Sequence, residues 1–119
     1  MATTVLGNGV NFPDSITQPT ASPKAWVTIN GTTSGSIRAS FNVSSVTYNG
    51  TGDFTVNFST AMPDANFVTC GLNGGTAGCD FMTLYQASFP NTTTSSRILT
   101  FNYATGNRNA LISGFVFFR

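Results

Sequence analysis

Residues 46–58 read VTYNGTGDFTVNF, and this stretch decides the fold class. The Asn-Gly pair at 49–50 accepts positive φ angles at low cost, which makes it a strong signal for the turn of a β-hairpin. After the turn, Phe54, Val56 and Phe58 alternate with polar residues. Alternation with a period of two places one face of a strand against a core and the other against solvent. The stretch therefore predicts two antiparallel strands with a tight connection.

The same alternation extends outward from this hairpin in both directions. Between residues 24 and 30, one side of a strand carries Ala25, Val27 and Ile29, and the other carries Trp26, Thr28 and Asn30. Residues 36–48 alternate as well, but the apolar phase slips at Ser44, which predicts a β-bulge there. In all we expect seven strands, at residues 24–30, 36–48, 53–60, 67–72, 80–88, 97–103 and 110–119. Short strands at this spacing are typical of antiparallel sandwiches and small barrels, and we predict an all-β antiparallel β-sandwich.

The first 23 residues differ from the rest of the chain. They hold three of the five prolines and few apolar residues. Each proline removes a backbone donor and favours an extended conformation before it. We therefore predict an extended attachment arm at residues 1–23, with one short strand at 9–12, followed by a β-sandwich head domain at residues 24–119.

Composition excludes several functional classes. Charged residues make up 8% of the 119 residues, and the net charge is +1. Five scattered cations form no basic stripe, which argues against binding to nucleic acid. No apolar run approaches the length of a membrane span, and no signal peptide is visible, so we expect synthesis in the cytoplasm without membrane insertion. Thr, Asn, Ser and Gly supply 55 of the 119 residues, so hydroxyl and amide groups, rather than charged groups, must hydrate the surface.

Catalytic chemistry has few candidate groups in this sequence. The chain contains no His and no Glu, so the usual general bases reduce to four Asp residues. These Asp residues stand where turns are expected, a position that Asp favours for local hydrogen bonding. No nucleophile elbow, phosphate loop or cluster of metal ligands is present. We therefore expect no enzyme, no cofactor and no metal site.

Two cysteines flank a glycine-rich stretch. Cys70 and Cys79 are nine residues apart, on either side of residues 73–78. They could close a disulfide across a hairpin, or remain two small, buried free thiols; a metal site would lack its other ligands. Synthesis in the cytoplasm favours reduced thiols while the chain folds, whereas an oxidising environment outside the cell favours the disulfide.

Several strings in the first half resemble a β-rich module of tailed-phage tail-fibre and virion structural proteins. They read FPDSITQ at 12–18, KAWV at 24–27, IRASFNVSSV at 37–46, GTGDFTVNF at 50–58 and AMPDANF at 61–67. The resemblance covers roughly residues 10–70, a little over half of the chain. It implies a virion protein that is commonly trimeric and often faces the host, and it assigns no binding residue.

The C-terminal strand carries a second signal for assembly. Residues 115–118 read FVFF and are apolar on both faces, so one face belongs to the core and the other needs a cover. The low content of charged residues also favours assembly, because the apolar surface of such a domain can be covered by neighbouring subunits. The candidates for a trimer interface are Trp26, Phe115, Phe117 and Phe118.

Taken together, these features predict a tail-fibre-like homotrimer of the virion that binds the host. Residues 1–23 would bind other virion proteins, and loops of the head would bind a host-surface polysaccharide or protein. Neutral hydrogen-bonding groups suit sugar hydroxyls. The candidate loop residues are Asn73, Thr76, Asn91, Thr92, Thr93, Thr94 and Arg108. Two alternatives are a capsid or tail decoration protein that stabilises the particle and a free carbohydrate-binding module.

Overall fold

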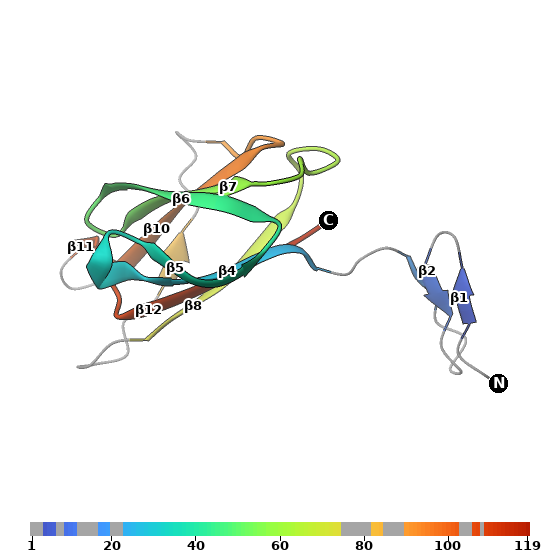
Figure 1. The fold of residues 1–119 in the computed structure, drawn as a ribbon, viewed down its shortest axis with the longest axis horizontal. Helices are drawn as coiled ribbons and strands as arrows, with labels where there is room; N and C mark the ends of the chain where they lie inside the picture. The colour runs from blue at the N-terminus through green and yellow to red at the C-terminus, as the bar shows by residue number, and fades with distance from the viewer. Residues whose placement is uncertain are drawn as a thin grey trace.

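The computed structural model is an all-β sandwich, as the alternation predicts (Figure 1). It describes residues 4–6, 9–11, 17–19, 23–74, 82–84, 90–102, 106–107 and 109–119. In these ranges the only helical segment is one 3-10 turn, η1 (Gly31–Thr33), and none of them contains a helix long and apolar enough to cross a membrane.

Two antiparallel sheets form the layers of the sandwich. The first has the order β5-β4-β12-β8, with β4 (Pro23–Asn30), β5 (Ser36–Phe41), β8 (Val68–Gly74) and β12 (Ile112–Phe118). The second has the order β11-β10-β7-β6, and β9 also pairs with β10. Its strands are β6 (Val43–Gly50), β7 (Asp53–Phe58), β9 (Met82–Leu84), β10 (Ser95–Asn102) and β11 (Gly106–Asn107).

The core lies between the two sheets and is formed by the faces that alternation predicted. In β7, the side chains of Phe54, Val56 and Phe58 are buried, and the residues between them are partly exposed. From the first sheet come Ala25, Val27, Ile29, Phe115 and Phe117. The aromatic rings of Phe58, Phe67 and Phe117 meet edge to face, with centroids 5.0–5.9 Å apart. Such pairs are favourable beyond the area they bury.

The strand expected at residues 36–48 is two strands, and this corrects the sequence interpretation. The chain leaves the first sheet after β5 and enters the second as β6, with Asn42 between them at a φ of 53°. Asparagine adopts this left-handed conformation more readily than other side chains. The bulge expected near Ser44 is confirmed, because the pairing of β6 with β7 shifts register between Val43 and Ser45.

Other elements differ in extent from the expectation. Within the expected strand at 80–88, the structure describes the three residues of β9, and the remaining positions lie outside the described residues. Where one short strand was expected at 9–12, three short strands pair with one another in the order β1-β2-β3: β1 (Thr4–Leu6), β2 (Gly9–Asn11) and β3 (Thr17–Pro19).

Strand directions give the sandwich two distinct ends. We call one the arm end, because it contains the start of β4, with Pro23 opposite Phe118 in β12. Asn42 and the loop before β10 lie there too, since Asn42 donates to the Lys24 carbonyl oxygen and the Met62 amide donates to the Thr93 carbonyl oxygen. We call the other the far end. It contains η1, the turn at 50–52, Gly74 and Asn109, whose Oδ1 accepts from the Gly52 amide at 2.7 Å.

Candidate functional site

The outer face of the β5-β4-β12-β8 sheet is apolar, and it has no cover in the described structure. Strand register aligns its side chains in rows across the sheet, such as Phe41, Trp26, Val116 and Cys70. We call this surface the outer apolar face and define it by Trp26, Thr28, Ala39, Phe41, Val68, Cys70, Leu72, Gly114, Val116 and Phe118. Leu72 is 84% exposed, Val68 61% and Phe41 56%. These are large apolar side chains in contact with solvent.

The sequence of β12 explains why the sheet is apolar on both sides. Its inward residues are Ser113, Phe115 and Phe117, which are buried, and its outward residues are Gly114, Val116 and Phe118. A half-solvated antiparallel sheet would place polar residues at the outward positions. Here the outward positions lack such residues, so this sheet is built as if both of its faces were to be covered.

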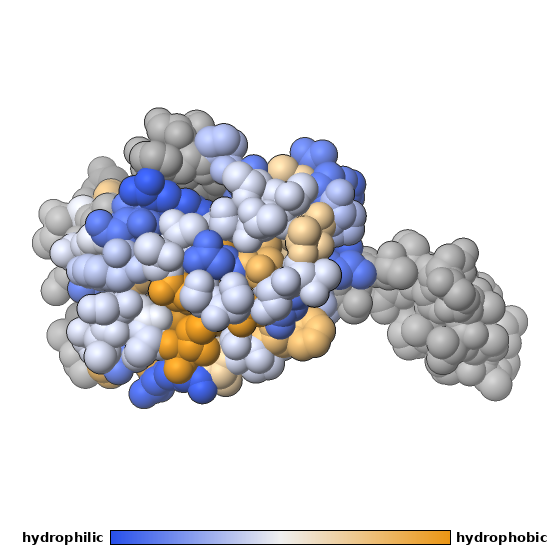
Figure 2. All heavy atoms as spheres, turned by 45° about the horizontal axis from the view of Figure 1, so that its top comes forward, coloured by the Kyte–Doolittle hydropathy of each residue, from blue (hydrophilic) through white to orange (hydrophobic). Residues whose placement is uncertain are grey.

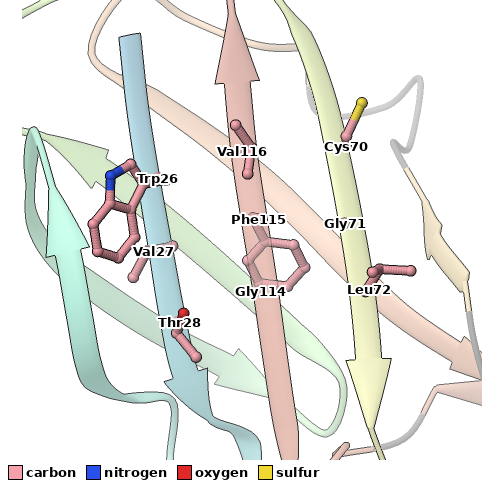
Figure 3. A pocket seen from close by; sticks show the side chains of 9 residues that line it. All are labelled: Trp26, Val27, Thr28, Cys70, Gly71, Leu72, Gly114, Phe115 and Val116. Atoms are coloured by element: carbon pink, nitrogen blue, oxygen red, sulfur yellow. The ribbon is translucent and has the colours of Figure 1, made fainter. Parts of the chain in front are cut away.

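A groove crosses the middle of the outer apolar face (Figure 3). Trp26 and Thr28 of β4 form one wall, and Cys70 and Leu72 of β8 form the other. Between them β12 contributes Gly114, which has no side chain, so the floor is low. The groove has a volume of about 420 Å³. A Cβ added to Gly114 would meet no atom within 4 Å, which shows that the space above this residue is open.

The predicted interface residues divide between the two faces of the sheet. Trp26 and Phe118 lie on the outer apolar face, each a little over one-third exposed. Phe115 and Phe117 are 1% and 0% exposed and pack in the core, so neither can contact another subunit; the sequence-based assignment of these two residues is wrong. The reason is alternation, which turns Phe115 and Phe117 away from Val116 and Phe118.

Leu72, Val68 and Phe41 belong to the outer apolar face but were not singled out from the sequence. In β8, Val68, Cys70 and Leu72 alternate with Thr69, Gly71 and Asn73. That alternation was visible, yet it was compatible with an inward apolar face. The small side chains at the alternate positions, with Gly71 at their centre, are the signal that could have indicated an outward apolar face.

The candidate recognition loops do not form one cluster. Asn91, Thr92, Thr93 and Thr94 precede β10 and lie at the arm end, whereas Asn73 stands near the far end, where β8 finishes. Thr76 and Arg108 lie outside the described residues. The candidate residues of the described loops therefore stand at opposite ends of the sandwich, because β10 runs from the arm end to the far end.

Many polar groups of the arm-end loop are already used within the chain. The Thr92 hydroxyl accepts from the Ser95 amide at 2.9 Å and from the Thr94 amide at 3.2 Å. The Asn91 Oδ1 accepts from the Ser96 hydroxyl at 2.8 Å. These bonds shape the turn into β10, as Ser and Thr side chains often do in loops. Thr93 is exposed.

At the far end, two buried side-chain oxygens lack hydrogen-bond partners. Asn73 and Ser113 are opposite each other in the pairing of β8 with β12, and the Asn73 Oδ1 and the Ser113 Oγ are both unpartnered. Buried polar atoms are usually satisfied by protein or by ordered water. This pair therefore marks a place near the end of the sandwich where a water molecule would be stabilised.

The outer face of β6 and β7, in the second sheet, has the opposite character. The Asn57 side chain donates to the hydroxyls of Ser45 at 3.0 Å and Thr47 at 3.1 Å, and Asn49 donates to the Thr55 hydroxyl at 2.8 Å. Figure 2 shows hydrophilic side chains over the part of the molecule that includes β6 and β7. The β6–β7 part of the second sheet thus presents hydroxyls and amides to solvent, next to the outward, partly exposed Leu99 and Phe101 of β10, whereas the first sheet presents apolar side chains.

Two bidentate ion pairs hold described carboxylates. Arg97 Nη2 lies 2.6 Å from Asp53 Oδ2 on the second sheet, and Arg119 Nη2 lies 2.5 Å from Asp64 Oδ2 at the arm end. The hydrogen bond from Arg97 lowers the pKa of Asp53 below its ordinary value. The hydrogen bond from Arg119 lowers the pKa of Asp64 in the same way.

These shifts predict how stability depends on pH. The unfolded chain binds protons at Asp53 and Asp64 at a higher pH than the folded chain does, so the free energy of unfolding falls as pH falls below about 4. The sequence contains no His, so we expect a flat profile between about pH 5 and 8. Urea unfolding at several pH values measures this. Asp53→Asn should reduce the acid-side slope, and a strong loss of stability between pH 8 and 6 would contradict the prediction.

Of the two cysteines, the structure describes Cys70. Cys70 has a free thiol exposed on the outer apolar face, and Cys79 lies outside the described residues. The expectation of a buried thiol is wrong for Cys70, which is exposed, and the disulfide with Cys79 stays one of the two alternatives that the sequence left open. In the part of the chain that the structure describes, no three residues of the types His, Cys, Asp and Glu gather into a possible metal site.

The fold and its surfaces define the class of protein: a small antiparallel β-sandwich with one apolar outer face and a polar outer surface over β6 and β7. Comparison of the chain with models of protein families, with curated proteins and with solved structures finds no match. The functional proposal therefore rests on the residues and surfaces described above, together with the tail-fibre resemblance of the sequence.

Proposed function

We propose that this chain is a structural protein of a bacteriophage virion: a tail-fibre-like module that assembles as a homotrimer and binds the host surface. The observation that carries the proposal is the contrast between the two outer faces of the sandwich. An exposed apolar face of this size on a small domain marks an interaction surface. The outer face of β6 and β7, which carries hydroxyls and amides, suits the outside of an assembly.

The orientation of the head supports a division of labour between its ends. β4 begins at the arm end, so residues 1–23 join the head there. If these residues attach to other virion proteins, the far end points away from the particle. The far end then carries the surface that binds a host polysaccharide or protein. Of the loop candidates, Asn73 belongs to that end, and the residues at 91–94 belong to the attachment side.

A double variant tests the recognition loops that are predicted from the sequence. Thr76→Ala combined with Arg108→Ala should lower the binding of the purified protein to host cells at least tenfold, because it removes a hydroxyl and a charge from the candidate loops. Thr93→Ala is the matched control, since Thr93 is an exposed hydroxyl in the loop at the arm end. Cell binding is measured by sedimentation with labelled protein, and circular dichroism melts confirm that each variant folds.

The result also separates the alternatives. Undiminished cell binding by the double variant would remove these loops as the receptor site. No cell binding by the wild-type protein, together with a location on the capsid in imaged particles, would favour a decoration protein. A monomer with affinity for a free polysaccharide would favour an independent carbohydrate-binding module.

A further inference from the structure

We infer that the outer apolar face is the docking surface for a second copy of this chain, with Leu72 of one copy seated in the groove over Gly114 of its neighbour. The inference deepens the proposed function, because it rests on the self-association contained in it and names the surface responsible. Three properties of the face support a copy of the same chain as the occupant: its area, its shape and its charge.

The area fits a protein partner better than a small ligand. Trp26, Phe41, Val68, Leu72 and Phe118 together leave roughly 500 Å² of surface exposed, if a large side chain presents about 200 Å². One partner in a standard protein–protein interface contributes about 800 Å², and the backbone and smaller residues of the sheet add to this sum. A ligand that filled the groove alone would leave Phe41, Val68 and Phe118 in water.

The shape of the face is self-complementary. Leu72 projects from β8 with 84% of its surface exposed, so it makes few contacts in its own chain. Beside it lies an open groove of about 420 Å³ with a glycine floor, large enough for a leucine side chain. A projection and a hollow on the same surface allow two copies to fill each other's grooves, or one copy to fill the groove of the next around a ring.

The charge of the face excludes a strongly charged partner. The described carboxylates of Asp53 and Asp64 are engaged by Arg97 and Arg119, away from this face. By strand alternation, Lys24 stands on the outer side of β4, two residues from Trp26, at the margin of the face. The exposed Arg38 stands on the edge strand β5. An apolar surface with these two cations at its edges offers little to a polyanion and matches a second copy of itself, whose Lys24 and Arg38 can remain in solvent.

The test fills the groove without disturbing the fold. Gly114→Val adds a side chain where no atom lies within 4 Å, and valine suits a strand, so the variant should melt at or above the wild-type temperature. Its dissociation constant for self-association should rise at least tenfold, as measured by sedimentation velocity over a range of concentrations. Gly50→Val is the matched control: this glycine also has open space, but it lies on the other sheet.

A second variant and a chemical probe keep the test independent of folding defects. Leu72→Asn removes the projecting apolar group from an exposed position and should weaken association by at least as much as Gly114→Val. In a Cys79→Ser background, Cys70 should react slowly with iodoacetamide in the wild-type assembly and at least tenfold faster in either variant, because Cys70 lines the groove.

The outcomes distinguish this inference from the proposed function. Wild-type protein that associates while Gly114→Val and Leu72→Asn associate equally well, or more tightly, would overturn the docking surface and leave the trimer and host binding intact. Wild-type protein that stays monomeric at all concentrations would overturn both the docking surface and the homotrimer. Wild-type protein that assembles but does not bind host cells would count against the role in host binding alone.

Discussion

Phe117→Asp should leave the chain unfolded at 25 °C, whereas Phe118→Asp, one residue further along the same strand, should leave it folded. Phe117 is fully buried, and its ring centroid lies 5.0 Å from that of Phe58 and 5.9 Å from that of Phe67. Removing a buried Phe costs about 3–5 kcal/mol, and an unpaired buried carboxylate adds several more. The total is as large as the free energy of unfolding of many small domains, which lies at roughly 5–15 kcal/mol.

Phe118→Asp acts on the opposite face of the sheet. Its side chain is partly exposed, so the new carboxylate stays hydrated and the cooperative melt should survive with a small shift. Association should weaken, because a charge now stands in the outer apolar face. Far-ultraviolet circular dichroism melts and light scattering on both variants provide the comparison. A cooperative melt of Phe117→Asp close to the wild-type temperature would show that Phe117 is not in the core.

Period-two alternation was sufficient to predict the fold class and most of the core. In β4 and β7 one face is uniformly apolar, so the assignment of Val27, Ile29, Phe54 and Val56 to the interior followed directly. These strands need no knowledge of their neighbours, because a shift by one residue would turn polar side chains inward.

The C-terminal strand could not be assigned in the same way. Residues 115–118 are apolar at every position, so alternation separates them into two sets without saying which set is inside. The pairing with β4 decides it, because Phe115 is opposite the buried Val27 and Val116 is opposite Trp26. Pairing between strands that are far apart in the sequence cannot be derived from the alternation within one strand.

Loop positions posed a different problem. Residues 91–94 and Asn109 lie on either side of one stretch of chain, and nothing in their composition shows that the two are separated in space by the length of a strand. Likewise, the groove depends on Gly114 lying between Thr28 and Leu72, which are far apart in sequence. The sequence indicates that the C-terminal strand is apolar. The groove is visible only once the strand register places Gly114 between its two neighbours.

The break between β5 and β6 was missed for a related reason. Apolar alternation continues through Asn42, so the pattern contains no interruption there apart from the slip at Ser44. What ends the strand is a single residue with positive φ whose side chain is held by partners 18 residues away on either side along the chain.

Asn42 therefore should be one of the most sensitive polar positions in the head. Its Nδ2 donates to the carbonyl oxygens of Lys24 at 3.0 Å and Thr60 at 3.1 Å, and its Oδ1 accepts from the Thr60 amide at 2.7 Å. One amide thus ties β4, the corner and the segment after β7 together at the arm end. Each such bond contributes about 1 kcal/mol, and a left-handed backbone costs other residues about 1–2 kcal/mol.

Two substitutions separate these contributions. Asn42→Gly keeps the backbone conformation but loses the three side-chain bonds, so the free energy of unfolding should fall by about 3 kcal/mol. Asn42→Ala loses the same bonds and replaces asparagine by a residue that adopts a φ of 53° less readily, so the fall should be about 4 kcal/mol or more. Urea unfolding at pH 7 measures both. Equal losses in the two variants would mean that the backbone is relaxed without asparagine, and a loss below about 0.5 kcal/mol in both would mean that the corner is held by the sheets alone.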